Sequence, residues 1–287
     1  MENVATKQSA IEIMAAEFVN LLERGIVPWD SSWADSGIPA NLLTKRPYRA
    51  INLLLLGAYE YSSNYFLTED QLARLGGQVY RGQQAHVLVD GIGFRSLRPY
   101  EVYNVSQCGN LPKGIVLENH PKQNPIAIYK EIIEQMSCCP KLLHDSEKGS
   151  YDIREDVIHM PPMAHIDSPD EYFAQFFRQL VSATKHPSRL GREDSIEPAM
   201  TPMSSDRLEE LIVEIGAWYL RSFTGLRVKT PLHGHGYASF WIDFVIRNPF
   251  VAHIGCLHAQ EAVEFILGTP FDEKEALDYV ADEMLPF

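Results

Sequence analysis

The stretch that most strongly indicates the fold reads SPDEYFAQFFRQLVS and occupies residues 168–182. Ser168 is a favoured helix N-cap, Pro169 suits the first helical position, and Glu171 is placed to return a hydrogen bond to the cap. Apolar residues then recur at helical spacing along one stripe: Phe173, Phe176, Phe177, Leu180 and Val181. The stretch therefore predicts a helix with one face buried in a core.

The polar face of this helix carries Arg178, Gln179 and Ser182. In a zinc peptidase helix of the H-E-x-x-H type, two His one turn apart bind the metal and the Glu acts as general base. A guanidinium stays protonated and offers no acceptor, so Arg178 cannot bind a cation. A Gln side chain cannot take up a proton. We therefore expect no metal or other cofactor; zinc is possible in principle but not expected.

Further along, a second long helix is predicted from about Asp206 to Phe223. It places Glu210 and Glu214 four residues apart on one face, where acids are commonly solvated or paired with the helix dipole. Two final helices are expected near Ala252–Leu267 and Asp272–Met284. Scattered histidines are more often surface or core residues than metal ligands; they are His159, His165, His186, His233 and His235.

The first half of the chain predicts an α+β domain. Ser9 with Glu12 and Thr68 with Gln71 have capping-box spacing, so a helix is expected after each Ser or Thr. Residues 111–125 are rich in Pro, Gly, Asn and Lys and indicate a linker. Two domains, residues 1–125 and a mainly helical 126–287, are expected, each able to bury its own core. The other expected elements are a buried helix at Ala50–Tyr59, strands at Ala85–Asp90 and Tyr100–Val105, a helix at Ile126–Met136 and a short strand pair at Tyr151–Met160.

Charge is divided unevenly between the two halves. The formal net charge is -13 at pH 7; residues 1–125 hold 11 Lys and Arg against 12 Asp and Glu, whereas residues 126–287 hold 14 against 26. Because Lys and Arg neutralise phosphates, this excludes a protein that wraps nucleic acid over its whole surface. Any nucleic-acid site belongs in the first half.

Within that half, the segment from Asn41 to Arg98 has seven Lys and Arg against four acids. Unpaired bases stack on aromatic faces while cations follow the phosphates, so cations interleaved with aromatics are typical of single-strand binding. From composition alone, burial in the core is the more common explanation of such aromatics. They are Trp29, Trp33, Tyr48, Tyr59, Tyr61, Tyr65, Phe66 and Tyr80.

The compartment is also predicted by composition. No apolar run approaches the 18 residues of a membrane span, and the N-terminus lacks the pattern of a secretory signal, so a cytoplasmic protein without a membrane partner is expected. The four cysteines show neither zinc spacing nor the density of a disulfide scaffold. We expect them to be reduced thiols.

Four motifs in the first half are specific enough to compare with a family: IVPW (26–29), NLLTKRPYRAIN (41–52), LGGQVYRG (75–82) and YNVSQC (103–108). In order and spacing they resemble the N-terminal single-stranded-DNA-binding domain of ArdC-type antirestriction proteins and TraC-type plasmid primases. Residues 172–192, 209–217 and 237–267 are similar to the same family's zincin-like metallopeptidase domain. Where the family pattern has H-E-L-I-H, this chain has RQLVS at 178–182.

The resemblance implies a single-stranded-DNA-binding domain followed by a zincin-like domain without peptidase activity, in an antirestriction-like protein of a mobile element or phage. Single-stranded DNA is the expected partner, and a host defence or restriction protein is a further candidate. The implied DNA-binding residues are Trp29, Asn41, Thr44, Lys45, Arg46, Tyr48, Arg49, Asn52 and Arg81. The degenerate metal-site positions are Arg178, Gln179, Ser182, Glu210 and Glu214, and Arg178 is expected to pair with Glu210 or Glu214.

Two other functions stay open at this stage. One is a metallohydrolase with an atypical ligand set that includes His186, Glu210 and Glu214, against which Arg178 argues. The other is an acidic protein-binding or DNA-mimicking surface that inhibits a host nuclease, which the charge of residues 126–287 favours.

Overall fold

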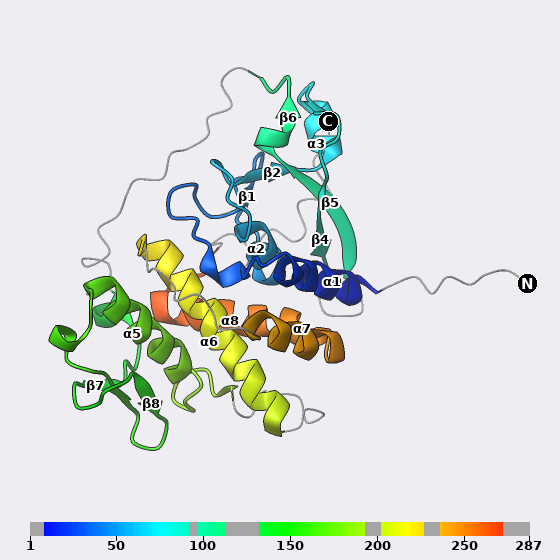
Figure 1. Cartoon of the computed structure of the whole chain (residues 1–287). Helices are drawn as coiled ribbons and strands as arrows, with labels where there is room; N and C mark the ends of the chain where they lie inside the picture. The colour runs from blue at the N-terminus through cyan, green and yellow to red at the C-terminus, as the bar shows by residue number, and fades with distance from the viewer. Residues whose placement is uncertain (1–8, 92–96, 113–131, 193–201, 227–235, 272–287) are drawn as a thin grey trace, which may run out of the picture.

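In a computed structural model of the chain, the described residues are 9–91, 97–112, 132–192, 202–226 and 236–271, with the side chains of 202–204 left out. Figure 1 shows a sheet above, α1 and α2 in the middle, and the helices α6, α7 and α8 below. The N-terminal domain is α+β, and the second domain is mainly helical, as the sequence predicts. None of the described helices is long and apolar enough to cross a membrane.

The N-terminal domain contains one mixed sheet of four strands in the order β1-β2-β5-β4. Strand β1 runs parallel to β2, and the other neighbours are antiparallel. A second, two-stranded sheet joins β3 to β6. The elements are α1 (Ala10–Glu23), η1 (Pro28–Asp30), β1 (Ala40–Asn41), α2 (Ala50–Gly57), β2 (Tyr65–Leu67), α3 (Glu69–Arg74), β3 (Gln78–Val79), β4 (His86–Asp90), β5 (Arg98–Asn104), η2 (Val105–Gln107) and β6 (Cys108–Gly109).

The second domain packs a small sheet against helix α5. Its strands lie in the order β7-β9-β8, with β7 parallel and β8 antiparallel to β9. The elements are β7 (Lys141–Leu143), β8 (Ser150–Asp152), β9 (Val157–His159), η3 (Met163–His165), α5 (Pro169–Ala183), α6 (Pro202–Thr224), α7 (Tyr237–Arg247) and α8 (Phe250–Leu267).

Local signals place the helix starts where the sequence predicts them. Two of the three expected capping boxes are present, at Ser9 with Glu12 and at Thr68 with Gln71, whereas Glu171 does not return a hydrogen bond to Ser168. The Ser168 side chain accepts a hydrogen bond from the Glu171 backbone N–H, so α5 begins as expected. Helix α7 was not predicted. Several expectations fall outside the described residues: most of the linker at 111–125, most of the Ile126–Met136 helix, the Asp272–Met284 helix, His233 and His235. The domain boundary near residue 125 therefore stays a prediction.

The N-terminal half has two small buried clusters of its own, around Leu67 and around Phe66, but the largest core cluster is shared between the two halves. One continuous core joins residues of α1, the Trp29–Trp33 segment and α2 to residues of α5, α6, α7 and α8. The Trp33 ring lies 4.6 Å from the Trp218 ring, centroid to centroid, and Trp218 Nε1 donates to the Ser31 carbonyl at 2.7 Å. Residues 10–58 therefore complete the core of the second domain and also support the sheet of their own domain.

Candidate functional site

Arg178 and Glu214 form an ion pair across the α5 and α6 helices. The Arg178 side chain is 38% exposed and that of Glu214 is 14% exposed. Burial lowers the pKa of the Arg178 guanidinium, but the Glu214 carboxylate more than offsets this and holds the pKa above its usual value. The expected pairing of Arg178 with a glutamate of the neighbouring helix is confirmed, with Glu214 as the partner.

The surroundings of Glu214 connect this ion pair to the N-terminal domain. Arg221, on the same helix, donates from Nη2 to the Trp29 carbonyl at 2.8 Å. Trp29 Nε1 in turn donates to the Tyr237 hydroxyl at 3.0 Å. Burial lowers the pKa of Arg221, and the Glu214 charge acts in the opposite direction. Burial, with a smaller contribution from Glu214, raises the pKa of Tyr237. One carboxylate thus acts on two guanidinium groups.

The other expected metal-site positions make their own contacts, although the Glu210 charge also helps to raise the pKa of Arg178. Glu210 pairs instead with Arg207, at 2.9 Å, and its side chain is 42% exposed. Gln179 approaches Gly149, close to the start of β8. Ser182 lies half-buried on α5. Within the described ranges, no three His, Cys, Asp or Glu side chains gather in the way that would hold a metal ion.

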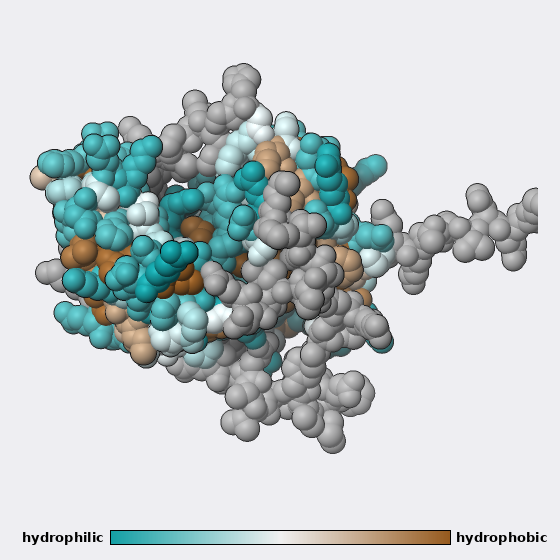
Figure 2. Space-filling view, turned by 90° about the horizontal axis from the view of Figure 1, so that it is seen from below, coloured by the Kyte–Doolittle hydropathy of each residue, from teal (hydrophilic) through white to brown (hydrophobic). Residues whose placement is uncertain are grey.

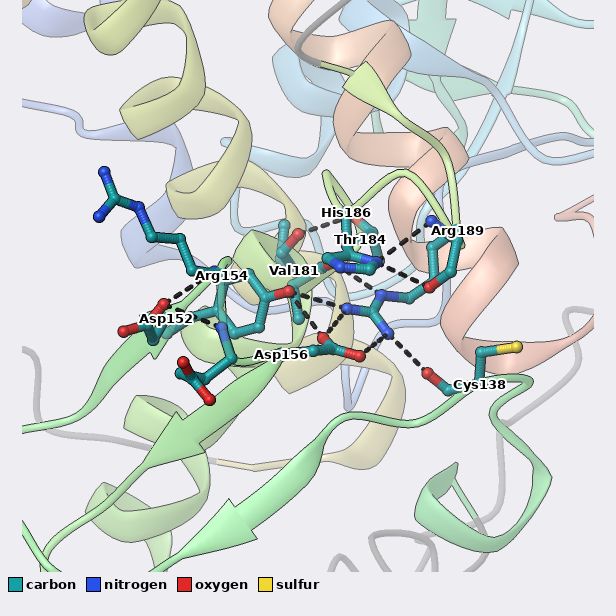
Figure 3. A network of polar contacts seen from close by, with 12 residues as sticks. Cys138, Asp152, Arg154, Asp156, Val181, Thr184, His186 and Arg189 are labelled. Atoms are coloured by element: carbon teal, nitrogen blue, oxygen red, sulfur yellow. Dashed lines mark hydrogen bonds and ion pairs between the residues drawn. The ribbon is translucent and has the colours of Figure 1, made fainter.

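The loop after α5 is fixed by a buried arginine (Figure 3). Arg189, whose side chain is 0% exposed, forms an ion pair with Asp156. It also donates to the Cys138 carbonyl at 2.7 Å and to the Tyr151 hydroxyl at 2.9 Å. His186, in the same loop, has its Nδ1 2.7 Å from the Ser188 hydroxyl. The loop therefore has a structural anchor, and His186 contacts a loop serine.

In the N-terminal domain, the NLLTKR motif forms a hairpin loop after β1. Asn41 Oδ1 accepts from the backbone N–H groups of Leu43 and Thr44 at 3.0 and 3.1 Å, and Asn41 Nδ2 donates to Gln71 at 2.9 Å. Asn41 thus shapes the loop and attaches it to α3. Thr44 and Lys45 are exposed at its tip, and Lys45 Nζ lies 4.1 Å from the centroid of the Tyr65 ring.

Trp29, Tyr48 and Asn52, which are also expected to bind DNA, are buried or hydrogen-bonded within the fold, and their role at DNA stays a prediction. Trp29 is 1% exposed, so its ring cannot stack on a base. Tyr48 is 8% exposed and packs against Phe66; burial raises its pKa to about 12. The Asn52 amide bonds both the N–H and the carbonyl of Val89, at 3.0 and 2.7 Å, and so covers part of the edge strand β4.

The remaining cations are accessible. Arg46 is half-buried, the Arg49 side chain is 40% exposed, and Arg81 is exposed. The sequence names Tyr80 only among the aromatics interleaved with cations and not among the DNA-binding residues, yet it is 52% exposed beside Arg81; Leu43, which the sequence does not single out, is 43% exposed at the loop tip. A signal was present for Tyr80: it lies between a short strand and the turn glycine Gly82, where a side chain has few neighbours to cover it.

Figure 2 shows another face of the molecule, on which apolar residues form separate patches among hydrophilic ones. Single exposed apolar residues are normal for a folded protein and indicate no site by themselves.

Known protein families match both domains of this chain. Residues 8–105 match the model of the N-terminal domain of anti-restriction factor ArdC, and residues 131–250 match the model of a zincin-like metallopeptidase. The chain belongs to an ArdC-type family. Two solved structures of the antirestriction ArdC protein from plasmid R388 have the same fold. The Mn(II)-bound one has a TM-score of 0.70 at 24% identity and covers 90% of this chain and 97% of that one. The metal-free one also has a TM-score of 0.70 and 24% identity, with 89% and 96% covered.

Two curated relatives of the ArdC-type chain are DNA primases TraC of Escherichia coli, both 24% identical over 310 residues. They match 96% of this chain, but the chain spans only 28% of one relative and 21% of the other.

The zincin-like domain of this family member does not fit a bound metal at the α5 helix. Arg178 offers only donors, and it takes up the carboxylate of Glu214. A tetrahedral zinc site needs three or four N, O or S ligands, and the described residues of α5 and α6 here supply acids that are paired with arginines.

Proposed function

We propose that this ArdC-type chain binds single-stranded DNA through its N-terminal domain, as an antirestriction-like protein, and that its zincin-like domain has no peptidase activity. The observation that carries the proposal is the exposed loop tip at Thr44 and Lys45, whose shape is set by Asn41 and which is followed by the half-buried Arg46. The family match supports it, as do the similar proteins, which are an antirestriction protein and DNA primases.

The physical basis is a division of roles between two kinds of residue. Lys45, Arg46 and Arg81 would contact phosphates, which gives a salt-dependent affinity. Tyr80, exposed and next to Arg81, would stack on a base, which contributes about 1 to 3 kcal/mol without counterion release. The two contributions can therefore be separated by titrating salt.

The test is a fluorescence-anisotropy titration of the full-length chain with a labelled single-stranded oligonucleotide at several salt concentrations. The double variant Lys45→Gln, Arg46→Gln should bind more weakly, and the slope of log K against log salt should flatten by about 0.7 for each phosphate that is no longer neutralised. Tyr80→Ala should weaken binding with the slope largely unchanged. Lys141→Gln with Lys148→Gln removes the same charge from exposed positions of the second domain and serves as the matched control.

Absence of binding by the wild-type chain even at low salt would contradict the proposal. The acidic second domain, with 26 acids against 14 Lys and Arg in residues 126–287, would then make an inhibitory protein-binding surface the leading candidate function.

A further inference from the structure

The backbone turns sharply at Ala50, the first residue of α2, which directly follows the cationic segment Lys45–Arg49. Its φ is +48°, in the left-handed region that residues with a side chain rarely occupy. The second domain holds both polar backbone groups of this residue. Gln260 Oε1 accepts from the Ala50 N–H at 2.8 Å, and the Tyr219 hydroxyl donates to the Ala50 carbonyl at 3.2 Å. Helices α6 and α8 therefore fix the position at which the segment leaves the N-terminal sheet.

A carboxylate of the same helix reaches the cationic segment directly. Glu264, one turn after Gln260 on α8, accepts on Oε1 from Gln260 Nε2 at 2.7 Å and from the Phe271 N–H at 3.0 Å. Arg49 Nη2 lies 3.6 Å from the same oxygen. The Glu264 side chain is 19% exposed and that of Arg49 is 40% exposed, so the carboxylate is fixed while the guanidinium stays accessible to a ligand.

We propose that Glu264 is an intramolecular competitor of DNA phosphate for Arg49, through which the second domain lowers the affinity of the first for single-stranded DNA. The proposal rests on the proposed function, because it requires that the chain bind DNA. A phosphate that contacts Arg49 must compete with a negative charge already 3.6 Å away. In the free protein, that charge offsets part of the attraction of Arg49 for the strand.

The variant Glu264→Gln tests this competition. Glutamine keeps an oxygen that can accept from Gln260 and Phe271, so the packing of α8 is preserved while the charge is removed. We expect the Kd for a labelled single strand to fall about 3- to 10-fold at low salt, and the salt slope to steepen by about 0.7 as Arg49 neutralises a phosphate without competition from Glu264. Asp243→Asn removes the same charge from an exposed position on α7 and is the matched control.

A change due to net charge alone would be equal in Glu264→Gln and Asp243→Asn, and that result would overturn the proposal, as would unchanged or weaker binding by Glu264→Gln. In an Arg49→Gln background, Glu264→Gln should have no further effect, since the competing pair is gone. An effect that persists there would also overturn it. Failure of the proposed function is distinguishable, because the wild-type chain would then bind no DNA and both proposals would fall together.

Gln260 is a positioning residue by the same geometry. Gln260→Ala removes the hydrogen bond that holds Ala50 in its left-handed conformation, and binding should weaken severalfold with the salt slope unchanged. Adding Ala50→Gly should restore much of the affinity, because glycine adopts a positive φ without support. A purely structural role would give a lower melting temperature that Ala50→Gly does not rescue, and that result would contradict the positioning role.

Discussion

At the scale of single residues, the Arg178–Glu214 pair should stabilise the fold. Arg178→Ala removes the ion-pair partner of a carboxylate that is only 14% exposed and leaves Arg221 as the other cation acting on it. Because Arg178 itself is 38% exposed, the expected cost is on the order of 1 to 2 kcal/mol, between that of an exposed and a buried pair. Urea denaturation measures it. Arg207→Ala breaks the more exposed pair with Glu210 and should cost under about 1 kcal/mol. Equal losses of stability in the two variants would show that the Arg178–Glu214 pair stabilises the fold no more than an exposed pair does.

His86 should make stability depend on pH. Its Nε2 lies 2.8 Å from the Tyr61 hydroxyl, its ring packs 4.4 Å from that of Tyr59, and burial lowers its pKa from 6.5 to about 4. As pH falls through 6.5, His86 becomes protonated in the unfolded chain but not in the folded one, so stability present above pH 6.5 is lost progressively down to about pH 4.

The variant His86→Gln should flatten this dependence. Between pH 7.5 and 5, the wild-type chain should lose about 1 to 2 kcal/mol more stability than the variant. Melting temperatures of both proteins across this range test it, and parallel curves would show that His86 does not carry the dependence.

The residue scale also shows where sequence reasoning ends. A family scaffold brings the helices of Arg178 and Glu214 together, which is why the sequence predicts that they meet, and the ion pair bears this out. The family resemblance implies that Trp29, Tyr48 and Asn52 bind DNA, because they lie in the matching motifs at 26–29 and 41–52. Alternation of cations and aromatics does not say which side chain faces the core. In the structure, Trp29 and Tyr48 are buried, and Asn52 is hydrogen-bonded to Val89.

At the scale of elements, local chemistry predicts the helices that begin with a side-chain cap. Helices α1, α3 and α5 all begin at the predicted Ser or Thr. Helix α7 has Gly236 as its N-cap, with no capping side chain, and its sequence YASFWIDFVIR is rich in aromatic and β-branched residues that favour a helix only weakly. Its existence depends on packing against α1 and α8, which no local pattern reports.

Because Arg178 of α5 contacts Glu214 of α6, we expect that a metal site can be rebuilt between these two helices. Arg178→His, Gln179→Glu and Ser182→His together place two His one turn apart on α5, and Glu214 already reaches position 178. The purified wild-type chain should contain well below one zinc or manganese ion per molecule, and the triple variant close to one, by elemental mass spectrometry after dialysis. Adding Glu214→Gln to the triple variant should abolish the gain.

Two results would contradict this assignment. Stoichiometric metal in the wild-type chain would show that a site exists without the two histidines. A triple variant that folds but binds no metal would show that the α5 face is not the former metal position.

At the scale of the whole molecule, the two domains share the largest core cluster, so the N-terminal half should not fold alone. Trp29 is 1% exposed because the rings of Tyr237 and Trp241 pack around it, at centroid distances of 6.3 and 5.7 Å. A fragment of residues 1–125 lacks both rings, and it would expose the face of α2 that packs on α8. Each large aromatic left in water costs about 1.5 to 3 kcal/mol, a substantial part of the stability of a domain of this size.

The fragment 1–125 should therefore show no cooperative thermal transition and no near-ultraviolet circular dichroism signal from ordered tryptophans. The full-length chain should unfold in a single transition, because a shared core couples the two domains. A fragment of residues 1–271, which keeps every described helix that contributes to the core, should melt like the full chain and serves as the control. A sharp transition in fragment 1–125 would show that the N-terminal domain is independent, and the contacts of Trp29 and Trp33 with the second domain would then be a docking interface between two folded units.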